Sequence, residues 1–275
     1  MSHPALARQP QLLKRRSRGA AITSTGVRCV RPGCARPSGT SAVRESDCNY
    51  FYWGSLRKTG MRQAIRNICR KGKRDDLVIV IQSYSRSTFL MEAFFKKGLR
   101  SLSLDHSDVL LLGWHNKPPA QKILDKALEM KEKGLYRFLG LSGHNRVLFP
   151  RLAGEGIFDL FHIRYNAAHR GAENETFPYL NGEDRPGIVS YTATRWGQML
   201  NKKRMPPNEH TPSASDCYRF VLSNPAVDVC MCGPKNTAQM REGLRTLDLG
   251  QLNQEELERM RKIGDHVHVH TRKFF

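Results

Sequence analysis

Short strand-like segments alternate with amphipathic helical segments along the chain from about residue 40 onward. Leu77–Gln82 is a continuous, mostly β-branched run, which is typical of a strand buried on both faces of a parallel sheet. A helical pattern over Thr88–Leu102 follows it. Strands that alternate with helices indicate parallel pairing through crossover connections, so the pattern predicts an α/β protein.

Eight strand candidates follow one another, each with room for a helix before the next. They are Val27–Cys34, Asn49–Tyr52, Leu77–Gln82, Asp108–Trp114, Arg137–Ser142, Phe158–Tyr165, Gly187–Tyr191 and Val227–Cys232. Eight such units within about 250 residues fit a (β/α)8 barrel better than a doubly wound sheet. We therefore predict an α/β fold, a (β/α)8 TIM barrel in a single domain.

The two ends of the chain depart from the repeating pattern. Pro32 lies in the first strand candidate, and proline cannot donate a hydrogen bond to a sheet, so we expect that strand to be weak or displaced. The last helical pattern ends near Ile263, and His266, His268 and His270 alternate after it. We predict a basic, poorly ordered extension over residues 1–24, the barrel over residues 25–265 and a histidine-rich tail over residues 266–275.

The chain carries 45 Lys and Arg against 25 Asp and Glu, a net charge of +20, and most of the excess lies at its start. From Met1 to Asp75 there are 17 basic and 3 acidic residues, or +14, which leaves +6 for the rest. The sequence shows none of the recognition motifs that nucleic-acid modules interleave with basic residues. We expect a basic leader and no specific nucleic-acid binding.

Membrane association and export are not indicated. The longest apolar run, Leu77–Ile81, is far shorter than the roughly 20 residues of a bilayer span. Seven cysteines without a Cys-x-x-Cys pair fit buried thiols better than disulfides or zinc. We predict a cytoplasmic protein without membrane association, and the sequence leaves the oligomeric state open.

Five segments at the predicted strands carry motifs in a characteristic order. They are Asp108–Trp114, Arg137–His144, Phe158–Asn166, Gly187–Leu200 and Met231–Glu242. In order and spacing they resemble the aldo/keto reductase family, whose matching motifs read Asp-x-x-x-x-His-Trp, iGiSn, fDxxQxxYN, giiaYsPLgxGlL and iPGxxxxeQlxEN. The resemblance runs from about Thr25 to Leu244. It implies a (β/α)8 barrel, an NADP(H) cofactor and reduction of a small-molecule carbonyl substrate.

The catalytic set of that family is altered at every matched position. In the family a Tyr donates the proton, a Lys paired with an Asp lowers the pKa of that Tyr, and a His orients the carbonyl. Here Tyr52 replaces the Asp, Arg57 replaces the Tyr, Gln82 replaces the Lys and Gly113 replaces the His. The resemblance therefore implies a divergent member with a degenerate catalytic tetrad.

Two polar residues near the altered positions are candidates for catalysis. Tyr52 offers a phenol at a strand end, with Tyr84 as an alternative phenol. His115 lies two residues from Gly113, and residues two apart on a strand share a face, so its side chain can lean into the space beside that glycine. We predict Tyr52 and His115 as catalytic residues. The alternative is that Tyr52 and Trp53 only fill the barrel mouth.

The positions that bind the cofactor in the family are better preserved. Ser142 matches the Ser that holds the nicotinamide carboxamide, His162 stands where a Gln contacts the same amide, and Tyr191 matches the aromatic residue that stacks on the ring. The segment that holds the adenosine end corresponds to Gly233, Pro234, Lys235, Gln239 and Glu242. The resemblance implies NADP(H) binding at these residues, and ordinary barrel structure is the alternative for each one alone.

Basic residues also gather on consecutive strand and loop segments. They are His144, His162, Arg164, His169 and Arg170. Such a group can hold an anionic substrate or, because histidine is a common ligand, a metal. No carboxylate stands at matched spacing, so we favour anion contact or hydrogen-bonded structure and predict no metal site.

Three functional hypotheses follow. The first is an NADP(H)-dependent oxidoreductase that acts on a carbonyl compound or its alcohol. The alternative is a non-catalytic nucleotide-binding barrel, a pseudoenzyme or sensor, which the four departures favour. The third is a barrel of another chemistry, such as a lyase or hydrolase that uses the histidines.

Overall fold

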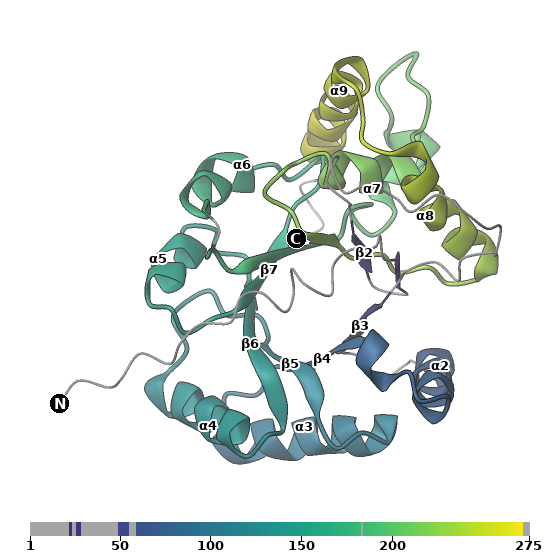
Figure 1. Ribbon diagram of the computed structural model, residues 1–275. Coiled ribbons are helices and arrows are strands. Elements are labelled where there is room, and N and C mark those ends of the chain that lie inside the picture. The colour runs from purple at the N-terminus through teal and green to yellow at the C-terminus, as the bar shows by residue number, and fades with distance from the viewer. Residues whose placement is uncertain (1–21, 24–25, 29–48, 55–58, 183, 272–275) are drawn as a thin grey trace.

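The computed structural model describes residues 22–23, 26–28, 49–54, 59–182 and 184–271. These residues form one curved nine-stranded sheet with helices around its outer face (Figure 1). The predicted extension lies outside the described residues except for Ile22–Thr23, and Arg57 lies outside them too.

Seven strands run parallel and are neighbours in the order in which the chain forms them. They are β3 (Tyr50–Trp53), β4 (Val78–Ser83), β5 (Ser107–Leu112), β6 (Tyr136–Gly143), β7 (Leu160–Arg164), β8 (Gly187–Tyr191) and β9 (Val229–Cys230). Parallel neighbours need long crossover connections, and the intervening helices supply them.

The α-helices and the short 3-10 helices have the following bounds. The α-helices are α2 (Thr59–Arg70), α3 (Thr88–Leu102), α4 (Gln121–Glu132), α5 (Leu148–Gly154), α6 (Ala172–Glu175), α7 (Ala214–Leu222), α8 (Thr237–Leu249) and α9 (Gln254–His270). The 3-10 helices are η1 (Arg74–Asp76), η2 (Phe177–Tyr179), η3 (Gln198–Leu200) and η4 (Lys202–Arg204).

Of the first strand candidate, Val27–Cys34, the structure describes only Val27–Arg28, and this part is not the parallel strand that we predict. Its described part belongs to β2 (Gly26–Arg28), which pairs antiparallel with β1 (Ile22–Thr23) and with β9. Only two residues separate β1 from β2, which is too short for a parallel crossover. Cα atoms of this hairpin come within 8 Å of β3, but the sheet ends at β3 without hydrogen-bonded closure.

The two faces of the sheet bury different side chains. Side chains along a strand alternate between faces, so in β4 Val80 points into the barrel while Ile79 and Ile81 pack against the helices. The interior cluster comprises Tyr50, Val80, Val109, Leu111, Leu160, Val189 and Val229. The same alternation turns Tyr52, Gln82, Ser142, His162 and Tyr191 inward near the carboxyl ends of their strands.

Three aspartates join neighbouring strands at the opposite, amino end of the barrel. Asp108 Oδ2 accepts a hydrogen bond from the backbone N–H of Ile79 at 2.8 Å. In the same way Asp159 accepts from Leu139 at 2.7 Å, and Asp228 accepts from Ile188 at 2.8 Å. Each aspartate also has a basic partner: Arg74 at 2.9 Å, Lys131 at 3.4 Å and Arg185 at 2.6 Å, respectively. We call this set of aspartates and their partners the lower rim.

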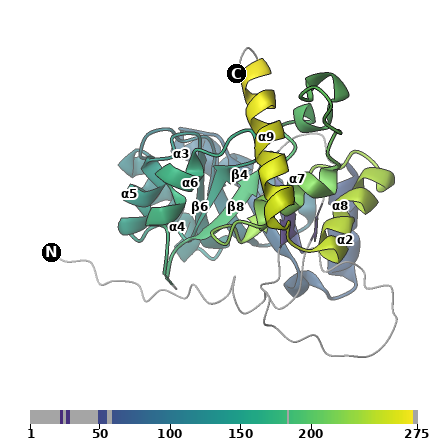
Figure 2. The ribbon, with the colours of Figure 1, turned by 90° about the horizontal axis from the view of Figure 1, so that it is seen from above.

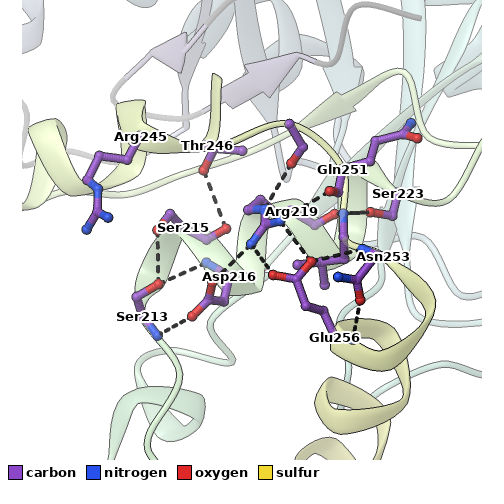
Figure 3. A network of polar contacts seen from close by, with 12 residues as sticks. Ser213, Ser215, Asp216, Arg219, Ser223, Arg245, Thr246, Gln251, Asn253 and Glu256 are labelled. Carbon is purple, nitrogen blue, oxygen red and sulfur yellow. Dashed lines mark hydrogen bonds and ion pairs between the residues drawn. The ribbon is translucent and has the colours of Figure 1, made fainter. Parts of the chain in front are cut away.

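The last helices are held together by a polar network centred on Arg219 of α7 (Figure 3). Its guanidinium donates two hydrogen bonds to Glu256 of α9, at 3.0 and 2.9 Å, and a third to the carbonyl of Gly250 at 2.9 Å. Asn253 and Glu256 form a capping box that begins α9. A charged side chain that satisfies several carbonyl and carboxylate acceptors fixes α9 against α7.

Helix α9 is longer than predicted. It continues past Ile263 to His270, so His266, His268 and His270 lie on its last turns and do not form a tail. Figure 2 shows α9 running along the outside of the barrel. At Gly264 an added Cβ would stand 2.1 Å from the carbonyl oxygen of Ala167, so only glycine allows this close approach of α9 to the loop after β7.

None of the described helices combines the length and apolar character that a bilayer span requires. Of the cysteines that the structure describes, Cys217, Cys230 and Cys232 are buried thiols and Cys69 is partly buried.

Candidate functional site at the barrel mouth

The inward-facing residues at the carboxyl ends of the strands meet at one end of the barrel, which we call the mouth. Tyr52 from β3 and Tyr84, just after β4, have their hydroxyl oxygens 3.2 Å apart. Below them, the hydroxyl of Tyr50 lies 2.7 Å from Nε2 of His162. Strands distant in the sequence thus bring phenols and an imidazole together where a barrel builds its site.

Two of the altered tetrad positions fit each other. Gln82 Nε2 donates to the hydroxyl oxygen of Ser142 at 3.2 Å. A Cβ added to Gly113 would stand 2.2 Å from that Gln82 nitrogen and 2.8 Å from Tyr84 Cδ1. The glutamine therefore occupies the space that a side chain at position 113 would need, and the two departures from the family pattern are coupled.

His115 does not fill the space beside Gly113, contrary to the prediction, because Gln82 and Tyr84 already do. It lies in the loop after β5 and lines an open pocket of about 570 Å³ together with Tyr84, Arg86 and other residues of the β4–α3 and β5–α4 loops. Its side chain is 5% exposed and its Nε2 has no hydrogen-bond partner. Burial, and secondarily Arg86, lowers the pKa of His115 to about 4, so the ring is neutral at pH 7.

The mouth contains no activated phenol among the residues that the structure describes. Burial raises the pKa of Tyr52, and its hydrogen bond with Tyr84 raises it further. Burial also raises the pKa of Tyr50 and of Tyr191. A phenol with a raised pKa is a weaker acid than the lysine-assisted Tyr that the family uses. Tyr52 is therefore a protonated phenol at the end of β3, in contact with Tyr84.

Ser142 retains a proton that it can donate. Its oxygen accepts hydrogen bonds from Gln82 Nε2 at 3.2 Å and from the backbone N–H of Trp114 at 3.1 Å. A serine hydroxyl accepts two hydrogen bonds and donates one, so its donor is left for a ligand. Gly143, which follows it, is required because an added Cβ would stand 2.0 Å from the carbonyl oxygen of His115. The glycine in place of the family's Asn thus has a local structural cause.

Tyr191 lies at the rim of the mouth and is half-buried. Its hydroxyl donates to the carbonyl oxygen of Gly143 at 3.1 Å, which fixes the ring against the end of β6. The ring of His144 lies next to it, tilted by 32° with centroids 6.3 Å apart. Tyr191 therefore presents a held aromatic ring beside Ser142.

His162 is buried beneath two tyrosines. It is 2% exposed, its Nε2 is engaged with Tyr50, and the ring of Tyr52 lies next to it at a centroid distance of 6.0 Å. Burial lowers the pKa of His162 to about 3, so the ring is neutral. His162 thus packs against the tyrosines, and its contact with a cofactor stays a prediction.

The segment after β9 is open at its start and engaged at its end. Gly233 and Lys235 are exposed, and nothing lies within 4 Å of a Cβ added to Gly233. Pro234, between these two residues in the sequence, is half-buried. Gln239 accepts a hydrogen bond from the backbone N–H of Lys235 at 2.8 Å. Glu242 instead holds α8 to α7, because its Oε1 accepts from the Ser215 hydroxyl at 2.7 Å. A ligand can reach the exposed residues, whereas Glu242 has a structural role.

The predicted basic cluster divides into two parts. Arg164 ends β7 half-buried, facing into the mouth. Burial lowers the pKa of both His144 and His169, and the charge of Arg164 lowers it further. Arg170 instead donates to Asp265 of α9 at 2.8 Å. His162 is buried against Tyr50. Sequence reasoning missed Arg146 and Arg195, which join Arg164. No group of three His, Cys, Asp or Glu in the described ranges is arranged to hold a metal.

No protein-family model matches the sequence, and no curated protein matches it. Solved structures do match. The holo form of an aldo-keto reductase from Bacillus halodurans superposes with a TM-score of 0.64 at 18% identity, covering 78% of this chain and 82% of that one. Its apo form gives a TM-score of 0.62 over 78% and 81% of the two chains.

An aldo-keto reductase from Klebsiella pneumoniae in complex with NADPH gives a TM-score of 0.63 at 18% identity, with 79% of this chain and 80% of that chain covered. These likenesses extend over most of both partners, and at this level of identity they concern the fold. The resemblance seen in the strand motifs is thus confirmed in three dimensions: the chain has the fold of the aldo-keto reductases.

Proposed function

We propose that the protein is a divergent NADP(H)-dependent oxidoreductase of the aldo-keto reductase type, acting on a small carbonyl compound or the corresponding alcohol. One observation carries the proposal: Ser142 and Tyr191 keep groups that a ligand can contact, whereas the positions of the family's catalytic residues are altered. The Ser142 hydroxyl has its proton to donate, and the Tyr191 ring is held beside it by the Gly143 carbonyl.

The residues present fit a nicotinamide dinucleotide. Ser142 would hold the carboxamide, Tyr191 would lie against the nicotinamide ring, and the exposed segment from Gly233 to Lys235 would hold the adenosine end. Asn236 caps α8, and Lys235 and Arg241 are exposed on either side of that helix N-terminus, so positive charge and helix dipole favour a 2′-phosphate. When bound, the cofactor supplies a hydride for a carbonyl carbon.

The chain must then supply a proton for the carbonyl oxygen. The Tyr52–Tyr84 pair is the donor that the mouth offers, because Tyr84 is half exposed and can pass a proton inward to Tyr52. A raised pKa keeps the Tyr52 phenol protonated at neutral pH, yet makes it a weaker acid. We therefore expect slow turnover compared with a barrel that has a lysine-assisted tyrosine.

A non-catalytic nucleotide-binding barrel is the second candidate. It is favoured by Gln82, which stands at the position of the family's catalytic lysine and donates its amide N–H to Ser142. Both candidates require cofactor binding, and they differ only in whether substrate-dependent hydride transfer occurs.

Two measurements separate these candidates. NADPH fluorescence during titration of the purified protein should saturate, and absence of saturable binding would rule out both. NADPH oxidation with a panel of aldehydes and ketones then tests turnover. We expect slow, substrate-dependent oxidation that Tyr52→Phe reduces by at least about tenfold, as loss of a proton donor does, whereas Tyr179→Phe, at an exposed site outside the mouth, leaves it unchanged. Binding without turnover would select the non-catalytic barrel.

A further inference from the structure

We propose that Arg164 binds a carboxylate of the substrate, so that the site takes short oxo acids or semialdehyde acids rather than neutral carbonyl compounds. The carbonyl half of this inference rests on the proposed function. The carboxylate half rests on the geometry around Arg164 alone.

Arg164 stands beside the proposed cofactor position. In β7 the side chains of Leu160 and His162 point into the barrel, so Arg164, two residues further on, points into the mouth. Its backbone partner in β8 is Tyr191. A group held by Arg164 would therefore lie next to the Tyr191 ring.

Arg164 forms no hydrogen bond and no ion pair with any residue that the structure describes. The acids at this end of the molecule are held by other arginines. Glu175 pairs with Arg146, Asp265 pairs with Arg170, and Glu173 pairs with Arg261, each at 2.8 Å. Half-buried arginines normally have such a partner, because removal of a charge from water is costly. Arg164 is left without one at the point where a ligand would enter.

Other cationic and polar side chains lie near Arg164. Burial lowers the pKa of Arg164, and the charge of Arg146 also lowers it, against an opposing effect of Tyr191. Arg195 is 3% exposed and donates to the carbonyls of Val267 and Thr271. Within the described part of the chain, Nε of Arg195 and the buried Nδ1 of His169 have no hydrogen-bond partner.

This local excess of positive charge, with unpartnered buried donors or acceptors around it, calls for an external anion. A guanidinium presents two parallel N–H groups that match the two oxygens of a carboxylate. With the carboxylate on Arg164 and the reacting carbonyl beside the Tyr191 ring, both groups must belong to one short molecule. The geometry thus favours a substrate in which a few carbon atoms separate them.

Binding of succinate, compared with the neutral succinamide, tests the carboxylate half directly. By calorimetry, without NADPH, we expect the protein to bind succinate and to show at least about tenfold weaker binding of succinamide. Arg164→Gln should weaken succinate binding by at least about tenfold. The matched control is Arg151→Gln, which removes the same charge from an exposed position on α5 and should change nothing.

Two outcomes overturn the inference. Equal binding of succinate and succinamide by the unaltered protein does so without any variant, and unchanged succinate binding by Arg164→Gln does so as well. NADPH titration of Arg164→Gln shows whether the variant is folded. The unaltered protein could also bind succinate selectively and fail to bind NADPH. That result would reject the proposed function and leave the carboxylate site standing. If the protein oxidises NADPH, we expect faster oxidation with succinic semialdehyde than with butanal.

Discussion

The two ends of the barrel differ in whether their charged side chains have partners. At the lower rim, Asp108, Asp159 and Asp228 each accept a backbone hydrogen bond from a neighbouring strand and each pairs with a basic side chain. At the mouth, Arg164 has no acidic partner among the described residues, and burial raises the pKa of Tyr52. The acids of the lower rim are thus paired where they hold the sheet together, whereas Arg164 lacks such a partner where the strands end.

This difference separates stability from function. A buried, paired carboxylate that also fixes a neighbouring strand stabilises the fold, and its removal leaves both a donor and a cation unpaired. A cation without a partner adds nothing to stability and is available to a ligand. Substitutions at the two ends should therefore have different signatures.

The largest effect is expected at the lower rim. Asp108→Ala removes the acceptor of the Ile79 N–H and the partner of Arg74, and should lower the free energy of unfolding by about 3 kcal/mol, measured by urea denaturation. Asp105→Ala, which removes an acid that is 91% exposed, is the control and should cost less than about 0.5 kcal/mol. A small effect of Asp108→Ala would break the contrast between the two ends.

A second effect concerns His162 and pH. Its pKa is about 3 in the folded protein and near 6.5 when unfolded, so below pH 6.5 the unfolded state binds the additional proton. Stability is therefore full above about pH 6.5 and is lost as pH falls, by about 1.5 kcal/mol between about pH 6.5 and about pH 5. Urea unfolding at both pH values checks this. His162→Gln should remove that part of the slope, whereas replacement of the exposed His210 should leave it.

A smaller effect should appear at Gly113. Gly113→Ala pushes Gln82 away and breaks its hydrogen bond to Ser142, which should cost about 1 kcal/mol of unfolding free energy. In the Gln82→Ala background the same change should cost less, because the amide is gone and only Tyr84 Cδ1 remains close to the new Cβ. A double-mutant cycle measures the coupling. Additive effects would show that the two positions do not constrain each other.

The smallest effect on stability is expected for Arg164→Gln. The variant loses no hydrogen bond or ion pair with a described residue and relieves repulsion with Arg146, so the free energy of unfolding should change by less than about 0.5 kcal/mol or rise. A loss as large as that of Asp108→Ala would make Arg164 a structural residue and remove the difference between mouth and rim.

Sequence patterns predicted the repeating elements well because hydrophobic period depends on neighbouring residues. Gly187–Tyr191 and Thr88–Leu102 have the predicted bounds. The sequence patterns say less about how deeply each side chain is buried. Period two placed His162 on the inner face, but its contact with Tyr50, 112 residues away, is visible only in the structure.

The same limit applies to closure of the barrel and to His115. A strand pattern at Val27–Cys34 does not state direction, and the short connection to β1 makes the described part antiparallel. His115 shares its alternation with Gly113, but whether the space beside that glycine is empty depends on Gln82 from another strand. Long-range packing decided both.

Binding of NADPH at Tyr191 tests the central proposal most directly. Fluorescence titration should give saturable binding by the unaltered protein and by Tyr191→Phe, which keeps the ring and loses only the hydroxyl bonded to Gly143. Tyr191→Ala should weaken binding by about tenfold, because stacking on an aromatic ring contributes about 1–3 kcal/mol. Equal affinities of Tyr191→Ala and the unaltered protein, or no saturable binding at all, would contradict a cofactor site at the mouth.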